Sequence, residues 1–548
     1  MPKSVMERNF HALANQKFDL LVCGGGIYGA WVAYDAALRG LRVAIVEKRD
    51  WASATSSASS KLIHGGLRYL ESFDFKLIKK ALAERDMLLA VAPHRVWPLH
   101  FGVPVYANGR IGSLQLKAGL IIYDFLATRL NQDLKHHHLK REDFCTRFPF
   151  LKHSNLSSGF IYTDAQTDDA RLVLELIDGA IQAGAVCVNY CKLTSLIETD
   201  GRAIGATVQD QLRTQTVDIH ARQIVYATGQ WQAGECGSRL TKGVHLVLPA
   251  MGVNDALLLT TPSDGRVFFI IPWYGMTLVG TTDNDYRGDI EQVKVEEADV
   301  SYLLAAVNDF LRTTWTQADI VNSYAGLRVL KGNEKAQGKQ DSPSSVSRDW
   351  ELKTAANGVH YSIGGKITSA REDAASIVNN ICAQLGKIKA CATIGKRFPW
   401  APARHPALGG SMQDEAARDI VPLWDHEWIR MNSLQAVRLG VDQESSLWLV
   451  RRHGQRVTEI FEMLKNDPQL ARRIVSSVPL IVADLLFCAG HEMVLHLPDL
   501  LRRRLPLLIL AKLTAQDIQA IAQSVAPIMM WDEQTISNEV SACLDGVT

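Results

Sequence analysis

A glycine-rich turn near the N-terminus constrains the fold of this chain more than any other feature. Three glycines define it at the spacing GxGxxG: Gly24, Gly26 and Gly29. The apolar run 18–23 precedes the turn, the alanine-rich stretch 28–38 follows it, and a second apolar run, 41–46, ends at Glu47. This order predicts a strand, a helix that starts at the turn, and a second strand of one βαβ unit.

Each glycine has its own role in such a turn. The first permits the tight turn, the second lets the backbone approach a pyrophosphate, and the third lets the helix pack closely on the strand. The helix N-terminus offers N–H groups to the phosphates, and the Glu47 carboxylate can accept both ribose hydroxyls. The turn therefore predicts a dinucleotide site over a merely structural turn, but it does not choose between NAD and FAD.

The next segment favours FAD. Residues 52–71 read ASATSSASSKLIHGGLRYLE. Small hydroxyl side chains suit a loop wrapped around a phosphate and an extended cofactor, and adjacent glycines allow close approach to a flat ring. A disordered serine linker is the alternative, but apolar residues that can pack follow the serines directly.

Further elements follow along the chain. Thr167 is placed to cap a helix that has Asp168 and Asp169 in its first turn. Strands are expected at 186–190 and 223–227. The later pattern predicts, in order, an antiparallel sheet over 246–280, a helix over 296–312, a polar surface loop over 332–350, a boundary near Pro402, Pro406 and Gly409–Gly410, and helices beyond 400.

Composition excludes several classes of protein. The net charge is +1, without the basic excess of a nucleic-acid binder. The nine cysteines form no CxxC pair, which argues against a zinc or dithiol site, and the run His136–His138 reads as solvated surface. We expect no metal. The N-terminus lacks a secretory h-region, and no apolar stretch reaches about 18 residues, so no spanning helix is expected.

The segment TSSASSKLIHGGLRYLE, at 55–71, closely resembles the FAD-dependent glycerol-3-phosphate dehydrogenases. Further matches follow in the family's order: YTDAQTDDARLVLE at 162–175, VYATGQW at 225–231, TKGVHLVLP at 241–249, IIPWYGMTLVGTTDNDYRGD at 270–289, YAGLRVL at 324–330, DSPSSVSRDWEL at 341–352 and SIGGKITSARE at 362–372. The resemblance covers roughly 15–400. It is weaker beyond, where 483–505 looks like the family's C-terminal helical domain.

The resemblance implies an α/β fold of three parts. The first is an FAD-binding Rossmann-like domain of the glutathione-reductase/D-amino-acid-oxidase kind, made of 15–91, 157–228 and 322–396. The second is an antiparallel-sheet cap domain that binds substrate, made of 92–156 and 229–321. The third is a C-terminal helical domain over 400–548.

The implied activity is oxidation of sn-glycerol 3-phosphate to dihydroxyacetone phosphate. Hydride passes from C2 of the substrate to N5 of FAD, and the electrons then pass to a membrane quinone. The family works in the cytoplasm, peripherally attached to the inner (cytoplasmic) membrane. Alternatives are an oxidase that uses oxygen, a flavoprotein acting on a related small hydroxy substrate, or an inactive flavin-binding protein. A homodimer is a further option that the sequence leaves open.

The motifs and the resemblance together assign the expected FAD contacts to four segments: Gly24, Gly26, Ile27, Tyr28 and Gly29 with Glu47 and Lys48; Thr55, Ser56, Ser59, Ser60, Lys61, His64, Gly65, Gly66 and Leu67; Ala227, Thr228 and Gly229; and Gly364, Gly365, Lys366, Ile367 and Thr368. The last segment leads into a helix near Ser369. A helix N-terminus there would aim positive partial charge at the N1/C2 carbonyl edge of the flavin and stabilise the reduced ring.

A phosphorylated substrate needs fixed cations, and arginine suits phosphate best because its guanidinium can donate two parallel hydrogen bonds to it. Arg68 and Arg328 are the candidates, and the resemblance places both at the substrate. The expected substrate site is completed by a hydrogen-bond donor, a further cation, a hydroxyl and a histidine: Tyr69, Lys366, Thr368 and His245.

Alcohol oxidation also needs a base for the hydroxyl proton, and histidine is the usual choice near neutral pH. His245 matches the family's histidine as base or substrate orienter, and His64 is its rival. Arg328 or Lys366 could also stabilise the developing alkoxide, so the base assignment stays open.

Four residues depart from the family pattern. Gln230 and Val329 stand where proline is usual, Ala370 replaces tyrosine or a similar residue, and Tyr28 replaces a smaller polar residue. They leave substrate preference and turnover open.

Two segments mix basic and apolar residues, as a membrane-surface segment does. They are 501–512, LRRRLPLLILAK, and 110–130, RIGSLQLKAGLIIYDFLATRL. For each, a buried core helix or a dimer contact is the alternative.

Overall fold

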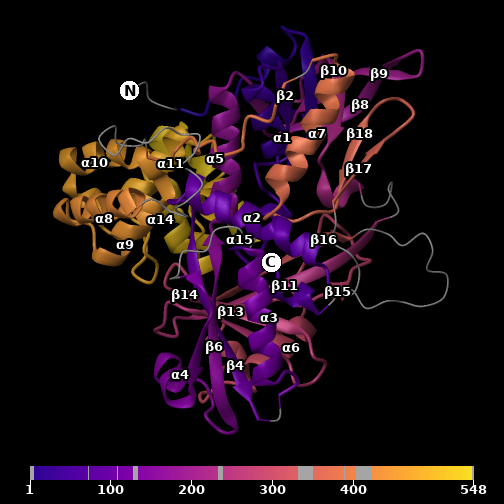
Figure 1. Cartoon of the computed structure of the whole chain (residues 1–548). Helices are drawn as coiled ribbons and strands as arrows, with labels where there is room; N and C mark the ends of the chain where they lie inside the picture. Colours follow the sequence, from indigo (N-terminus) through magenta and orange to yellow (C-terminus); the bar gives the residue numbers. More distant parts are fainter. Residues whose placement is uncertain are drawn as a thin grey trace.

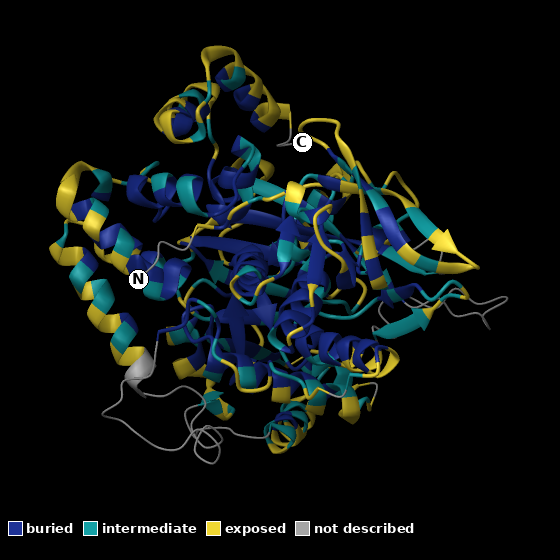
Figure 2. Cartoon of the chain, turned by 90° about the horizontal axis from the view of Figure 1, so that it is seen from above, coloured by how far each residue is buried: buried dark blue, intermediate teal, exposed yellow. Residues whose placement is uncertain are grey.

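A computed structural model of the 548-residue chain describes residues 5–71, 73–107, 109–127, 134–232, 238–330, 350–387, 389–402 and 423–545. Two β-sheets, each covered by helices, lie one above the other in Figure 1, and a layer of C-terminal helices packs beside them. Buried residues gather in the centre, and exposed residues follow the outer faces of the helices (Figure 2).

The predicted βαβ unit is confirmed. Strand β1 (Phe18–Cys23), helix α1 (Ile27–Leu38) and strand β2 (Val43–Val46) follow one another, and β1 pairs in parallel with β2. All the residues of β1 and β2 are buried, as expected of a strand that has neighbours on both sides.

Among the described residues, the first sheet has eight strands. Five of them run parallel in the order β18-β10-β1-β2-β7, with β17, β8 and β9 added antiparallel. Their bounds, beyond β1 and β2, are Val186–Val188 (β7), Cys191–Thr199 (β8), Arg202–Asp210 (β9), Thr216–Tyr226 (β10), Glu351–Thr354 (β17) and His360–Ile363 (β18). Helices α5 (Asp169–Gln182) and α7 (Ala370–Gln384) pack with α1 over one core.

The expected cap of α5 is wrong by one residue. Asp168, not Thr167, is the N-cap, and its carboxylate accepts a hydrogen bond from the backbone N–H of Arg171. Thr167 is still the last residue of strand β6 (Leu156–Thr167). Its backbone N–H donates to the carbonyl of Lys61, which keeps it in the sheet.

Ten strands of the described part of the chain form the second sheet, and the antiparallel sheet predicted over 246–280 lies in it. Every pair is antiparallel except β12 with β4. Besides β6, the strands are Leu62–Ile63 (β3), Val96–Tyr106 (β4), His137–Lys140 (β5), Arg239–Pro249 (β11), Ala256–Thr260 (β12), Val267–Trp273 (β13), Met276–Gly280 (β14), Asn284–Asp285 (β15) and Asn322–Leu330 (β16). Strands β6 and β16 were assigned from the sequence to the FAD-binding part, yet both belong to this second sheet, where β6 pairs with β4 and β16 with β11. The division into domains stays a prediction.

Helices cover both faces of the second sheet. On one face, α4 (Arg141–Arg147) and α6 (Glu297–Asn308) share a core with β11 to β14. On the other, α2 (Phe75–Val91) and α3 (Ser113–Leu126) join a core that includes most of the C-terminal helices. The expected loop over 332–350 and the boundary near Pro406 fall almost wholly outside the described residues.

The C-terminal part is helical, as predicted. Its α-helices are α8 (Leu423–Arg438), α9 (Gln443–His453), α10 (Val457–Asn466), α11 (Val482–His491), α12 (Leu497–Asp499), α13 (Leu507–Leu510), α14 (Ala515–Met529) and α15 (Glu533–Asp545). Buried ion pairs join them to the first sheet's helices and loops: Arg171 with Glu492, and Arg503 and Arg504 with Asp50.

The two membrane-surface candidates differ in the structure. Segment 501–512 is part of the core: Arg504 and the leucines of α13 are buried, so its interfacial interpretation is wrong. Helix α3, within 110–130, instead exposes Leu114, Ile121 and Phe125. Among the described residues, no helix is both long and apolar enough to cross a bilayer.

Candidate active site

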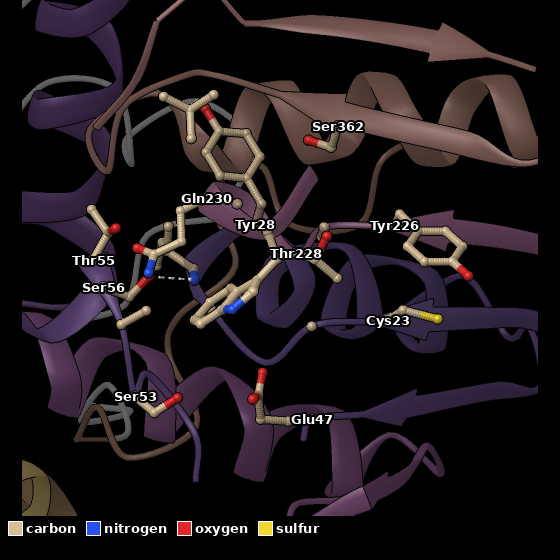
Figure 3. A pocket seen from close by; sticks show the side chains of 18 of the residues that line it. Cys23, Tyr28, Glu47, Ser53, Thr55, Ser56, Tyr226, Thr228, Gln230 and Ser362 are labelled. Carbon is tan, nitrogen blue, oxygen red and sulfur yellow. Dashed lines mark hydrogen bonds between the residues drawn. The ribbon is translucent and has the colours of Figure 1, made fainter. Parts of the chain in front are cut away.

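A cavity of about 410 Å³ lies where parallel strands of the first sheet end. Strands β1, β2, β10 and β18 end at Cys23, Val46, Tyr226 and Ile363, and a predicted cofactor segment starts within one or two residues of each end. Side chains from these ends surround the cavity in Figure 3. Ligands of open α/β sheets bind at this carboxyl edge, so parallel pairing brings together segments that are far apart in sequence.

The glycine turn forms the floor of this cavity. Gly24 has φ 109°, and a Cβ there would lie 2.6 Å from the carbonyl oxygen of Ala227. A Cβ on Gly29 would collide with the carbonyl of Gly24, so this glycine serves helix packing and does not line the cavity. The backbone N–H of Ile27, in the first turn of α1, donates to Ser56 Oγ at 2.9 Å. One side of the turn therefore packs against neighbouring backbone, and the other side lines the cavity. This arrangement fits a bound pyrophosphate.

Glu47 lines the same cavity, as predicted, and its carboxylate is labelled there in Figure 3. Its Oε2 accepts the backbone N–H of Gly25 at 2.7 Å, and Oε1 accepts that of Arg49 at 2.9 Å. Burial raises the pKa of Glu47 against the effect of these two bonds. Each oxygen keeps a lone pair for a ribose hydroxyl, so the residue fits the adenosine half of FAD.

A second cavity, of about 160 Å³, adjoins the first. The two share Thr55, Ser59, Arg328 and Ile367 in their walls. The second also contains Arg68, His64 and His245. The predicted phosphate-binding Arg68 and the two candidate bases, His64 and His245, thus lie around a cavity of the size of a small molecule, next to the larger cavity.

Arg328 is held firmly between the two cavities. It lies on β16, opposite Thr241 of β11. Its Nη1 lies 3.1 Å from Asp283 Oδ1, and its Nη2 donates to Thr281 Oγ1 at 2.8 Å. These contacts fix the plane of the guanidinium, which lets it present a preorganised fork to a phosphate or an alkoxide.

His245 lies on β11 at the second cavity and is almost fully buried. Its ring stacks on Tyr324 at 4.9 Å, and its Nε2 lies 2.9 Å from Ser60 Oγ. Burial, helped by Arg328 and Lys61, holds the pKa of His245 well below its ordinary value. The imidazole is therefore neutral near pH 7, and its surroundings oppose the protonated form. His64, its rival, lines the same cavity.

The remaining substrate candidates form a cluster beside the second cavity. Lys366 Nζ lies 4.0 Å from the centre of the Tyr69 ring, and Arg68 Nη2 is 3.3 Å from Tyr69 Oη. Lys366 lines the first cavity, whereas Tyr69 lines neither. Thr368 is buried behind the walls, where its Oγ1 accepts the N–H of His64.

The other predicted cofactor residues divide into three groups. Most line the first cavity: Gly24, Gly26, Ile27, Tyr28, Lys48, Ser56, Ala227, Thr228, Gly229, Gly364 and Gly365. Others line the second: Ser60, His64, Gly66 and Leu67. Lys61 and Gly65 lie behind the walls, where Lys61 Nζ pairs with Asp169 and the Gly65 N–H donates to Asp164. As FAD contacts, all of these assignments remain predictions.

Several lining residues were not anticipated as site residues from the sequence. Lys192 and Leu193 on β8 and Trp231 after the second glycine turn belong to the first cavity. Asp169, behind the walls, holds the serine loop: it pairs with Lys61 and accepts the Ser59 hydroxyl at 2.7 Å. The TDDAR motif was the available signal for Asp169; for Lys192 and Leu193 the sequence offers none.

Two family departures have structural consequences. The Tyr28 hydroxyl donates to Asp373 at 2.7 Å and accepts the backbone N–H of Lys366 at 3.0 Å, which joins the glycine turn to the start of α7. Gln230 Nε2 donates to the carbonyl of Ile290 at 2.8 Å, a bond that proline cannot make. Nothing in the structure explains Val329 or Ala370.

Comparisons with known proteins show the family to which the chain belongs. Residues 19–371 match the family model of FAD dependent oxidoreductases, and 407–536 match that of the C-terminal domain of alpha-glycerophosphate oxidase. The chain is 33% identical to a glycerol-3-phosphate dehydrogenase of Synechocystis sp. (91% of this chain, 90% of the relative) and 32% identical to an aerobic glycerol-3-phosphate dehydrogenase of Bacillus subtilis (91% and 88%). A solved glycerol-3-phosphate dehydrogenase from Bacillus halodurans, complexed with FAD, superposes with a TM-score of 0.76 at 27% identity, over 98% of this chain and 95% of that one.

Proposed function

Since the chain belongs to the family of FAD-dependent glycerol-3-phosphate dehydrogenases, we propose that it oxidises sn-glycerol 3-phosphate to dihydroxyacetone phosphate and passes the electrons to a membrane quinone. FAD is its cofactor. The observation that carries the proposal is the wall shared by the two cavities, where Arg328 borders both the cofactor space and the substrate space. A small phosphorylated alcohol bound by this arginine would have its carbon next to the flavin.

The chain's own residues supply binding and proton transfer. Arg68 and Arg328 bind the phosphate or steady the C2 oxygen, and the cluster of Tyr69 and Lys366 adds positive charge on the cofactor side. Bound FAD supplies the hydride acceptor. His245, which is neutral and lines the second cavity, is the group proposed to accept the hydroxyl proton as hydride leaves C2. The acceptance of that proton balances the hydride that leaves C2.

The exposed face of α3 supports attachment to a membrane. Leu114, Ile121 and Phe125 are 83%, 51% and 86% exposed, and they fall on one stripe of the helix. Phe73, at the neighbouring turn before α2, is 75% exposed, and Lys117 on α3 is also exposed. An apolar stripe flanked by lysine is the pattern of a helix that lies in the interface of an anionic bilayer.

A variant of α3 tests both membrane attachment and the acceptor. L114S/I121S/F125S should bind anionic vesicles about a hundredfold more weakly, because about 3 kcal/mol of apolar burial is lost. With quinone-loaded vesicles, the wild type should reduce quinone on addition of glycerol 3-phosphate and release little peroxide. The variant should lose most quinone reduction while it still reduces a soluble dye.

The matched control, I204S/L212S/I394S, removes three other exposed apolar side chains from outside α3. It should behave as the wild type. Equal vesicle binding by the two triple variants would contradict the α3 assignment. Stoichiometric peroxide with no quinone reduction would favour the oxidase alternative.

A further inference from the structure

Glu291 lies in the loop between β15 and α6 and joins three side chains from the first sheet. It accepts hydrogen bonds from Lys48 Nζ at 2.6 Å, Arg49 Nη2 at 2.5 Å and Trp231 Nε1 at 2.6 Å. Lys48 and Arg49 follow β2, whereas Trp231 follows the turn after β10. The Glu291 carboxylate, in a loop that follows a strand of the second sheet, thus connects the ends of β2 and β10 in the first sheet.

Two of these partners are walls of the cofactor cavity. Lys48 and Trp231 both line it, Lys48 next to Glu47 and Trp231 next to the Ala227–Gly229 turn. Lys48 Nζ also lies 4.0 Å from the centre of the Trp231 ring. The link through Glu291 therefore holds two walls together at the end of the cavity lined by Glu47.

A second contact fixes the same loop independently. Gln230 is buried and lines the cavity, and its Nε2 donates to the carbonyl of Ile290 at 2.8 Å. The loop around 290–291 is thus attached to the cavity wall by the hydrogen bond from the Gln230 side chain to the Ile290 carbonyl and by the Glu291 carboxylate. The second of these attachments depends on charge.

We infer that residues 290–291 form a strap that retains FAD, with Glu291 as its positioning residue. The strap must detach from Lys48, Arg49 and Trp231 before the walls can separate and the cofactor can leave. The charged side chains are partly exposed, 38% for Glu291, 30% for Lys48 and 47% for Arg49. Salt screens ion pairs at this exposure, so release of FAD should speed up with ionic strength. The inference rests on FAD binding, not on the substrate.

The test measures FAD dissociation from the holoenzyme, without substrate, by the change in flavin fluorescence after dilution. E291Q should release FAD about tenfold faster than the wild type at low salt, because an ion-pair network contributes more than one exposed pair. It should also lose most of the acceleration by salt that the wild type shows. K48A/R49A/E291Q should release FAD at most a few times faster than K48A/R49A, since only the hydrogen bond from Trp231 to the carboxylate would be left to weaken.

D285N is the matched control. Asp285 precedes the same loop and forms a comparably exposed ion pair with Arg239, and neither residue lines the cavity. Its release rate and salt dependence should equal those of the wild type. If E291Q released FAD at the wild-type rate, or if D285N accelerated release equally, the strap would be refuted while the proposed reaction would stand.

Discussion

Replacing Arg328 by alanine is expected to lower kcat/KM for glycerol 3-phosphate by about a thousandfold while FAD stays bound. Truncating one member of a desolvated charge pair typically costs 2–5 kcal/mol, and about 4 kcal/mol corresponds to this factor. Arg328 borders both cavities, but the glycine turn, Glu47 and the serine loop that cradle the cofactor keep all their contacts.

The decrease in kcat/KM should exceed the effect of losing one hydrogen bond, because R328A also removes the ion pair that Asp283 makes with Arg328. Asp283, whose side chain is 9% exposed, pairs with Arg328 and would face the substrate phosphate as a second negative charge. R328K should recover only part of the activity, because lysine keeps the charge without the fork. R266A, on a partly exposed arginine paired with Asp264, is the control and should leave kcat/KM unchanged. Steady-state kinetics and the content of bound flavin test this prediction. Loss of FAD from R328A would contradict the role of Arg328 in substrate binding.

Replacing Asp50 by asparagine should lower the free energy of unfolding by about 3–5 kcal/mol. Asp50 is fully buried and pairs with Arg503 and Arg504, which are buried as well. Burial alone would raise the pKa of Asp50, but Arg504 and Arg503 lower it. Its stabilising contribution is therefore present above the pKa of an unfolded aspartate and is lost as pH falls through the lower folded value.

Denaturant unfolding at neutral pH measures this effect, and D285N serves again as the control. Its ion pair is partly exposed, so its removal should change the free energy by less than about 1 kcal/mol. Because Asp50 lies three residues after Glu47, D50N should also weaken FAD binding. If D50N were as stable as D285N, the C-terminal helices would not depend on these pairs.

The βαβ unit and its glycine turn could be predicted because their signals are local. A run of apolar residues, a spacing of glycines and a carboxylate at a strand end occupy thirty consecutive positions. The cap of α5 was missed by one residue, because Thr167 and Asp168 are both good caps and only the pairing of β6 decides between them.

Contacts between residues far apart in the sequence explain which features could not be predicted from it. The two basic and apolar segments looked alike, yet 501–512 is buried because Asp50, some 450 positions earlier, pairs with its arginines. Among the residues that the structure describes, the outer stripe of α3 has no such partner and stays exposed. In the same way, the resemblance predicted a role for His245 but could not predict its contact with Ser60, which lies in the distant serine-rich loop.

The central claim is that this chain binds FAD and oxidises glycerol 3-phosphate. Anaerobic mixing of the holoenzyme with glycerol 3-phosphate, followed through the visible band of oxidised flavin, tests it most directly. We predict rapid loss of the band in the wild type, very slow loss in R328A, and none with glycerol, which lacks the phosphate that Arg68 and Arg328 would bind. A band that persists with glycerol 3-phosphate, or that disappears equally fast with glycerol, would contradict the account.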